Sequence, residues 1–324
     1  MRRRDFIALL GGMASSPLAA RAQSSSKRKR IAILSGVARK VNPPIVAFER
    51  GLQELGYVDG QNIEIDYRYA DGKVDQFPAL ARELIAHSPD VIFAAVTPAT
   101  VAARALTRTI PIVCPLLAYP IEFGLIANQA RPGGNVTGVL FRMEGLVSKQ
   151  VELALQLTPG LVKLGFVVNV ASDIIIDRQE VEETCRRLDI KAVPAEVRVP
   201  DDLDRAFHAI ADEHVEAIIV LVDPLFFQER DRVATLAAEV RLPAIYGFRS
   251  HVDAGGLISY GVNLDENFHR CATYVSKILK GANPGDLPVE FPTKIELIIN
   301  NAAAKALGLT IPPSVLVRAD EVIG

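Results

Sequence analysis

Two pairs of similar stretches, far apart in this chain, indicate a duplicated architecture. PDVIFAAVTPA, which begins at Pro89, is similar to VEAIIVLVDPL, which begins at Val215. In both stretches an apolar run ends at a polar residue that is followed by proline. TRTIPIVC, from Thr107, is likewise similar to EVRLPAIY, from Glu239, so that the order of the segments is also repeated. The chain is therefore expected to contain two similar halves.

Each half alternates apolar runs with amphipathic segments. The continuous apolar runs at 31–35, 90–96 and 163–170 are typical of strands that are buried on both faces. Helical periodicity follows at 43–55 and 173–188. Strands that alternate with helices predict a parallel sheet with helices on both faces. The expected fold class is therefore α/β, with two doubly wound parallel-sheet lobes. A single helix is expected over 225–240.

The repeat also suggests where a ligand would bind. Ligands of open parallel sheets bind beyond the carboxyl ends of the strands, and Thr97-Pro98 and Asp223-Pro224 occupy equivalent strand ends of the two halves. Each pair is typical of a helix start, with a capping side chain before a proline. A helix N-terminus also attracts anions. Thr97, Pro98 and the Ala99 amide could therefore meet a carboxylate, and Asp223 an amine or hydroxyl, or both pairs could be plain caps.

The first residues have the pattern of an export signal. MRRRDFIALLGG has a basic start and an apolar middle that is too short to span a bilayer. Ala20-Arg21-Ala22 then provides small residues for cleavage. RRDFI, from Arg3, is typical of the twin-arginine route. We expect residues 1–22 to be removed, so that the mature chain starts at Gln23 in the periplasm.

The charge of the mature chain argues against nucleic-acid binding. Removal of 1–22 takes away four arginines and one aspartate, which changes the formal net charge from −2 to −5. A mildly acidic protein is poorly suited to hold a phosphate backbone. The remaining basic run, Lys27 to Arg30, directly precedes an apolar strand and lacks aromatic neighbours. It is interpreted as a solvated lead-in.

Cysteines, histidines and known motifs indicate no catalytic or metal centre. Cys114, Cys185 and Cys271 are odd in number and widely spaced, which argues against a disulfide framework and a metal site, although a bridge between the last two stays open. The sequence has no phosphate-binding loop, dinucleotide fingerprint or nucleophile elbow. No cofactor and no metal are expected. A pair such as Asp223 and His251 is conceivable for an enzyme, but no motif supports it.

Several longer motifs resemble one known family. FERGLQELGYVDGQNIEIDYRYADG, IPIVCPL, ARPGGNVTGV, DPLFFQERDRVATLAAEVRLPAIYG, AGGLISYGVNL and PGDLPVE are similar to the ABC-transporter substrate-binding family that includes tryptophan/tyrosine-type uptake proteins. The resemblance covers nearly the whole mature chain. It implies a periplasmic binding protein with the type I two-lobed fold. Such a protein closes on a small ligand and delivers it to a permease with a cytoplasmic ATPase.

The resemblance also implies three hinge crossings between the lobes, which we place near Leu140, Val262 and Gly285. One lobe would then consist of 31–140 and 262–284. The other would consist of 141–261 and 285–324. Open and closed forms would interconvert about the crossings, and ligand contacts from both lobes would favour the closed form.

The chain departs from the family pattern at Tyr119-Pro120, where such proteins often carry aspartate-proline. Tyr119 offers stacking area and one hydroxyl in place of a carboxylate, and Glu122 is expected on a following helix.

The other candidates near strand ends or crossings are Ser35, Phe141, Arg142, Asn169, Tyr246 and Tyr260. Together they predict a cleft with aromatic walls. The favoured ligand is an aromatic or branched apolar carboxylate or amino acid, with Arg142 or the helix start at Thr97 holding its acid group.

Three functions remain open on the sequence alone. The first is a binding protein for uptake through a permease and its ATPase. A sensory binding protein that docks on a receptor would share every ligand contact. An exported enzyme on the same scaffold is disfavoured because no nucleophile–base, metal or cofactor signature is present. A transcription factor of this fold would need a helix-turn-helix before the first strand, where the sequence has the export signal.

Overall fold

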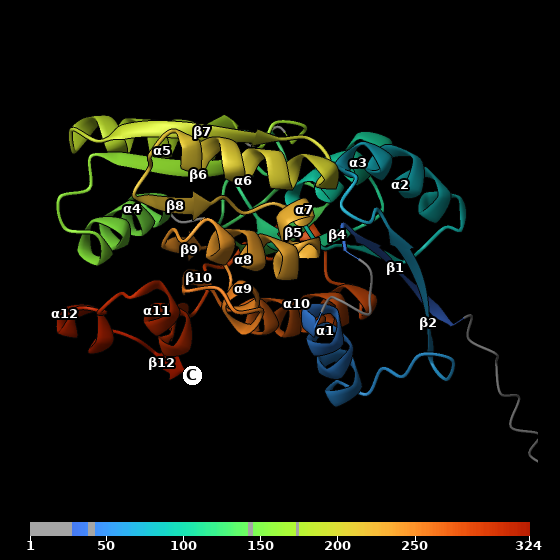
Figure 1. Cartoon of the computed structure of the whole chain (residues 1–324). Coiled ribbons are helices and arrows are strands. Elements are labelled where there is room, and N and C mark those ends of the chain that lie inside the picture. Colours follow the sequence, from blue (N-terminus) through green and yellow to red (C-terminus); the bar gives the residue numbers. More distant parts are fainter. Residues whose placement is uncertain (1–27, 38–42, 142–144, 173–174) are drawn as a thin grey trace, which may run out of the picture.

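The computed structural model describes residues 28–37, 43–141, 145–172 and 175–324. They form two α/β lobes that lie side by side, with a five-stranded and a seven-stranded sheet (Figure 1). The expected fold class is confirmed. The export signal at 1–22 and the candidate Arg142 lie outside the described residues.

The first lobe is built on a parallel sheet of order β2-β1-β3-β4-β5. Its strands are β1 (Lys29–Ser35), β2 (Ile63–Tyr69), β3 (Val91–Ala94), β4 (Ile112–Leu117) and β5 (Val136–Leu140). Its helices are α1 (Pro43–Glu54), α2 (Phe77–Ala86), α3 (Thr97–Leu106) and α10 (Leu264–Leu279), with short 3₁₀ turns at Val74–Gln76 and Pro284–Asp286. The alternation of strand and helix therefore produces the layering that the sequence predicts.

The second lobe has the sheet order β12-β11-β10-β9-β8-β6-β7. Its strands are β6 (Lys163–Asn169), β7 (Lys191–Val197), β8 (Ala217–Val220), β9 (Ala244–Tyr246), β10 (Ile258–Val262), β11 (Ile295–Asn300) and β12 (Glu321–Ile323). Its helices are α4 (Leu146–Leu157), α5 (Ile175–Arg187), α6 (Leu203–Asp212), α7 (Pro224–Gln228), α8 (Arg230–Glu239), α9 (Arg249–Asp253), α11 (Asn301–Leu307) and α12 (Pro313–Leu316), with a 3₁₀ turn at Pro200–Asp202. The pairs are parallel except β10 with β11, which is antiparallel.

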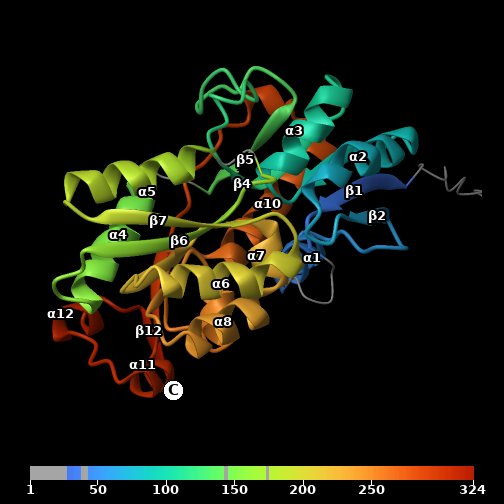
Figure 2. The same cartoon turned by 45° about the horizontal axis from the view of Figure 1, so that its top comes forward.

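The helix expected over 225–240 is divided in two. α7 ends at Gln228 and α8 begins at Arg230, because Glu229 has φ −93° and ψ 18° and leaves the helical region. The short α7 stands at the boundary between the lobes in both views (Figures 1 and 2). The first residues of α7, Pro224 and Leu225, face the first lobe.

Apolar side chains cover both faces of each sheet. On one face of the first sheet, Phe93 stacks on Phe48 of α1 at 3.9 Å between ring centroids and meets the edge of Phe268 of α10 at 5.5 Å. α1 and α10 lie beside one another on this face (Figure 1). Two helices that are distant in sequence therefore close the same core.

Three connections join the lobes. The chain leaves the first sheet after Leu140 and leaves the second sheet after Val262. The third crossing, expected near Gly285, lies later in the chain. The Gly285 carbonyl accepts a hydrogen bond from the loop before β5, and the Glu290 carbonyl accepts one from the Leu140 amide at 2.8 Å. The segment therefore stays with the first lobe through Glu290, and β11 of the second lobe begins at Ile295.

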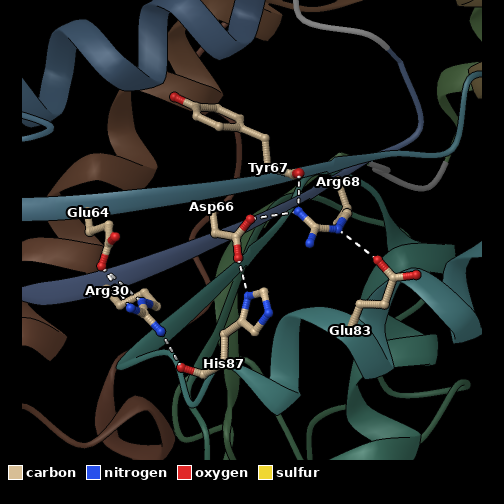
Figure 3. A network of polar contacts seen from close by, with 7 residues as sticks. All are labelled: Arg30, Glu64, Asp66, Tyr67, Arg68, Glu83 and His87. Carbon is tan, nitrogen blue, oxygen red and sulfur yellow. Dashed lines mark hydrogen bonds and ion pairs between the residues drawn. The ribbon is translucent and has the colours of Figure 1, made fainter.

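A network of charged groups braces the edge strand β2 (Figure 3). Asp66 accepts from Arg68 Nη1 at 2.7 Å and lies 2.5 Å from His87 Nδ1. Burial works to raise the pKa of Asp66, but the contacts with His87 and Arg68 outweigh it and lower the pKa. Arg30 pairs with Glu64 at 2.8 Å. The last residue of the basic run thus pairs within the fold, and the network stabilises the outer edge of the first lobe.

The three cysteines are buried free thiols. Cys185 lies in the core of the second lobe and Cys271 in the core of the first, so the bridge that the sequence leaves open does not form. Within the described part of the chain there is no group of three or more potential metal-ligating side chains. Among the same residues, no helix is long and apolar enough to cross a membrane.

Candidate functional site

A cavity of about 500 Å³ lies between the lobes. The first lobe contributes α2, α3, the end of β4 and the loop after it. The second lobe contributes the segments after β6 and β8. The described lining consists of Val74, Asp75, Phe77, Pro78, Val96, Thr97, Pro98, Val101, Ala102, Ala105, Leu116, Ala118, Tyr119, Phe123, Phe141, Ala171, Ser172, Asp177, Val222 and Pro224. Mostly apolar walls with a few polar groups are typical of a site for a small organic molecule.

Thr97 lines the cavity, but its side chain serves its own lobe. The hydroxyl donates to the Leu116 carbonyl and accepts from the Ala118 amide, both at 2.8 Å. The expected capping role is wrong, because Val96 is the N-cap residue and Thr97 is the first residue of α3. Pro98 also lines the cavity, whereas Ala99 is fully buried behind it. Thr97 therefore fixes the helix start against β4.

Asp223 is the helix cap that the sequence predicts. Its Oδ1 accepts from the Leu225 amide at 2.8 Å, with Pro224 at the start of α7. Asn169 Nδ2 donates to the same oxygen at 2.9 Å, and Ser172 donates to Oδ2 at 2.5 Å. Burial raises the pKa of Asp223, although the three hydrogen bonds work to lower it. The repeat thus locates both strand ends correctly, but only the second carries a capping side chain.

Tyr119 and Asp177 face one another across the cavity. Tyr119 follows β4 of the first lobe, and Asp177 is in the first turn of α5 in the second lobe. The Tyr119 hydroxyl donates to Asp177 Oδ1 at 3.4 Å. Asp177 is 1% exposed. Glu122, in contrast, is in an exposed turn, where the sequence predicts a helix. The cavity therefore contains a buried carboxylate from the second lobe, opposite Tyr119 of the first.

Phe141 and Ser35 line two different cavities at the boundary between the lobes. Phe141 lines the large cavity and packs against Phe248, with ring centroids 5.5 Å apart. Ser35 and Asp223 both line a second, smaller cavity of about 60 Å³. The Ser35 hydroxyl donates to the Val37 carbonyl at 2.8 Å. The two cavities adjoin, since Val96, Leu116, Val222 and Pro224 line both of them.

Two expected cleft residues lie elsewhere in the second lobe. Tyr246 is fully buried, and its ring stacks on His251 at 4.9 Å and lines a hollow between α8 and α11. Tyr260 lines a surface hollow beside α4 and β11. Successive side chains of a strand point to opposite faces, so these tyrosines follow the faces of their sheet and do not reach the cleft. The aromatic side chain that reaches the cleft after β9 is Phe248.

His251 and Asp223 do not form a catalytic pair. His251 Nε2 lies 3.2 Å from the Phe226 carbonyl, and burial lowers the pKa of His251 to about 4. Asp223 has the separate partners described above. The histidine is thus a neutral core residue, which gives the enzyme interpretation no support.

Sequence reasoning missed several cavity residues. Asp75, Phe77, Phe123, Ser172 and Asp177 all line the cavity. For Asp177 the sequence contains one signal of a binding role, because it is an acidic residue in the first turn of a helix that follows a predicted strand end. For Phe77 it contains none, since an apolar residue on an amphipathic helix is equally typical of the core.

Comparison with known proteins identifies the family. The family model for ABC transporter substrate binding proteins matches residues 32–323, nearly all of the described chain. The chain therefore belongs to the ABC transporter substrate binding protein family, as the resemblance of its motifs indicates. Members of this family bind small molecules outside the cytoplasm and work with a membrane permease, and they are binding proteins, not enzymes.

Individual relatives agree in sequence and in fold. A tyrosine-binding protein from Clostridioides difficile is 27% identical over 293 residues, which is 88% of this chain and 82% of that protein. A conserved domain protein from Vibrio cholerae is 30% identical with a TM-score of 0.85, and covers 91% of this chain and 100% of its own. A Streptococcus pneumoniae ABC domain in complex with L-Trp is 26% identical with a TM-score of 0.83, at the same coverage of both chains. The lobes therefore have an arrangement similar to that of the L-Trp complex.

Proposed function

We propose that this chain binds an amino acid with an aromatic or branched apolar side chain and delivers it to an ABC permease for uptake. The observation that carries the proposal is the pairing of a largely apolar cavity with the buried Asp177. An apolar cavity of about 500 Å³ suits such a side chain. The L-Trp complex and the tyrosine-binding relative support the same class of ligand.

Different polar groups of the cleft would bind the ammonium group and the carboxylate of the ligand. Asp177 would accept the α-ammonium group, with Tyr119 beside it. This carboxylate replaces the acidic group that the Tyr119-Pro120 sequence lacks. The carboxylate of the ligand would be held by Arg142 or by the start of α3. A ligand that touches both lobes stabilises the closed form, which is the form that the permease, driven by its ATPase, would receive.

The ligand is tested by calorimetry on protein that has been unfolded, dialysed and refolded to remove any bound molecule. L-tryptophan, L-tyrosine, L-phenylalanine and L-leucine should bind, whereas sugars and metal ions should not. Native mass spectrometry of protein purified without unfolding should find an amino acid of this class. A response only to sugars or metal ions would contradict the proposal.

The N-terminal residues support export by the twin-arginine route, with cleavage after Ala22. In cells, Arg3→Lys together with Arg4→Lys should leave the precursor in the cytoplasm. N-terminal sequencing of the exported wild-type protein should begin at Gln23. Export of the double variant at the wild-type rate would contradict this route without affecting the ligand proposal.

A further inference from the structure

The start of α7 contacts two glycines of the opposite lobe. A Cβ placed on Gly36 would lie 2.9 Å from Pro224 Cβ and 3.3 Å from its Cγ. At Gly72 the nearest atom to such a Cβ is Leu225 Cα, at 3.6 Å. The two glycines are joined, since the Gly72 amide donates to the Gly36 carbonyl at 2.7 Å. At these two glycines the first lobe thus has no side chains, and the ring of Pro224 packs against its backbone.

Space, and not backbone strain, requires glycine at position 36. Its φ lies outside the left-handed region that favours glycine. On its own lobe the nearest obstacle to a Cβ is Phe77 Cζ at 3.4 Å, an ordinary van der Waals distance. The Pro224 ring of the other lobe is the close contact. Alanine at position 36 would therefore interfere with the approach of the lobes and with little else.

Polar side chains hold both partners of this contact in place. On the first lobe, the Ser35 hydroxyl bonds to both the carbonyl and the amide of Val37, at 2.8 and 3.1 Å, which fixes the turn around Gly36. On the second lobe, Asn169, Ser172 and the capped amide hold Asp223 next to Pro224. These hydrogen bonds of Ser35 and Asp223 lie within their own lobes. The two residues therefore hold in place the two segments that meet between the lobes.

Apolar packing surrounds the same contact. Phe227 and Phe248 of the second lobe lie in one core cluster with residues of the first lobe, and both are at least nine-tenths buried. Their rings are 5.8 Å apart. The second, smaller cavity beside Pro224 has a volume of only about 60 Å³. Opening of the lobes would expose these rings to water, so the contact favours closure whether or not a ligand is bound.

We propose that Gly36 and Pro224 form a ligand-independent closing contact, which populates the closed form of the empty protein. Gly36 and Pro224 are then positioning residues for ligand binding, although neither needs to touch the ligand. The effect on affinity rests on the proposed function. The effect on the empty protein does not, because it concerns only the distance between the lobes.

The test measures this distance in ligand-free protein by electron paramagnetic resonance. Spin labels are attached through Arg82→Cys on α2 and Asp212→Cys on α6, two exposed positions on different lobes, while the native cysteines are buried. The wild-type background should show a short-distance population. Gly36→Ala should reduce this population at least several-fold. The matched control is Gly134→Ala, where no heavy atom lies closer than 3.9 Å to the new Cβ, and it should leave the distribution unchanged.

A second variant separates closure from folding. Pro224→Gly removes the ring, and in combination with Gly36→Ala it should restore part of the short-distance population, because the new methyl group fills the vacated space. Titration with L-tryptophan should give Gly36→Ala an affinity about tenfold weaker, in proportion to its smaller closed population. Identical distance distributions in wild type and Gly36→Ala, or a wild type with only the long distance, would overturn the proposal. Absence of L-tryptophan binding in every variant would instead count against the proposed ligand.

Discussion

Substitution of Asp177 tests directly how the α-ammonium group of the ligand is recognised. Asp177→Asn keeps the shape of the side chain and an oxygen that can accept from Tyr119, so the fold and the contact between the lobes should persist. The variant removes the negative charge from a residue that is 1% exposed. A hydrogen bond to a charged group contributes roughly 1.5–3 kcal/mol when it is buried. We expect a loss of about 2 kcal/mol, which is about 30-fold in Kd for L-tryptophan.

Calorimetry with a matched pair of ligands isolates this contribution. Indole-3-propionate has the ring and the carboxylate of tryptophan but lacks the ammonium group. Asp177→Asn should weaken L-tryptophan about 30-fold and should leave indole-3-propionate unchanged or bound more tightly, because a buried negative charge repels a carboxylate. Equal losses for both ligands would show that Asp177 acts on the shape of the cavity and would refute the assigned role.

Three further measurements test the buried groups of the fold. Asp223→Ala should lower the free energy of unfolding by about 3 kcal/mol in chemical denaturation, because three hydrogen-bond donors lose their partner. His251 has a folded-state pKa of about 4, below its usual 6.5, so folding favours its neutral form, and the unfolded chain takes up the proton first as the pH falls. The free energy of unfolding should therefore decrease as the pH falls from 6.5 to 4, by up to about 3 kcal/mol, and His251→Gln should flatten this decrease. Burial raises the pKa of Cys114 to about 12 and of Cys185 to about 11, so no thiol should react with Ellman's reagent until denaturant is added, after which all three should react.

The fold was predictable because its signals are local and repeated. The buried strands at 31–35 and 163–170, and the matching strand ends at Thr97 and Asp223, follow from apolar runs and from the duplicated pattern. The break at Glu229 was not predictable, because the residues on either side of it continue to fit one helical period. α7 meets the first lobe at Gly36 and Gly72, whereas α8 packs on the second sheet, so the two helices have different partners.

The site was less predictable than the fold, because side-chain direction decides it. Tyr246 and Tyr260 were expected in the cleft, but they point away from it on the faces of their sheet. Asp177 reaches the cavity only because α5 packs with its first turn towards Tyr119, a contact between residues of different lobes. A single sequence contains no record of such a contact. Position along the chain therefore identified the strand ends, but not the side chains that occupy the space beyond them.

The joint cover of the first sheet by α1 and α10 has a consequence for the order in which the protein forms on the ribosome. α1 begins at Pro43, whereas α10 begins at Leu264. The first lobe therefore cannot bury Phe48 and Phe93 fully until most of the chain has been synthesised. During that interval the unfinished face of its sheet is exposed and prone to aggregation. The lobe that starts first is thus completed late, and it is the part of the nascent chain for which a chaperone would matter most.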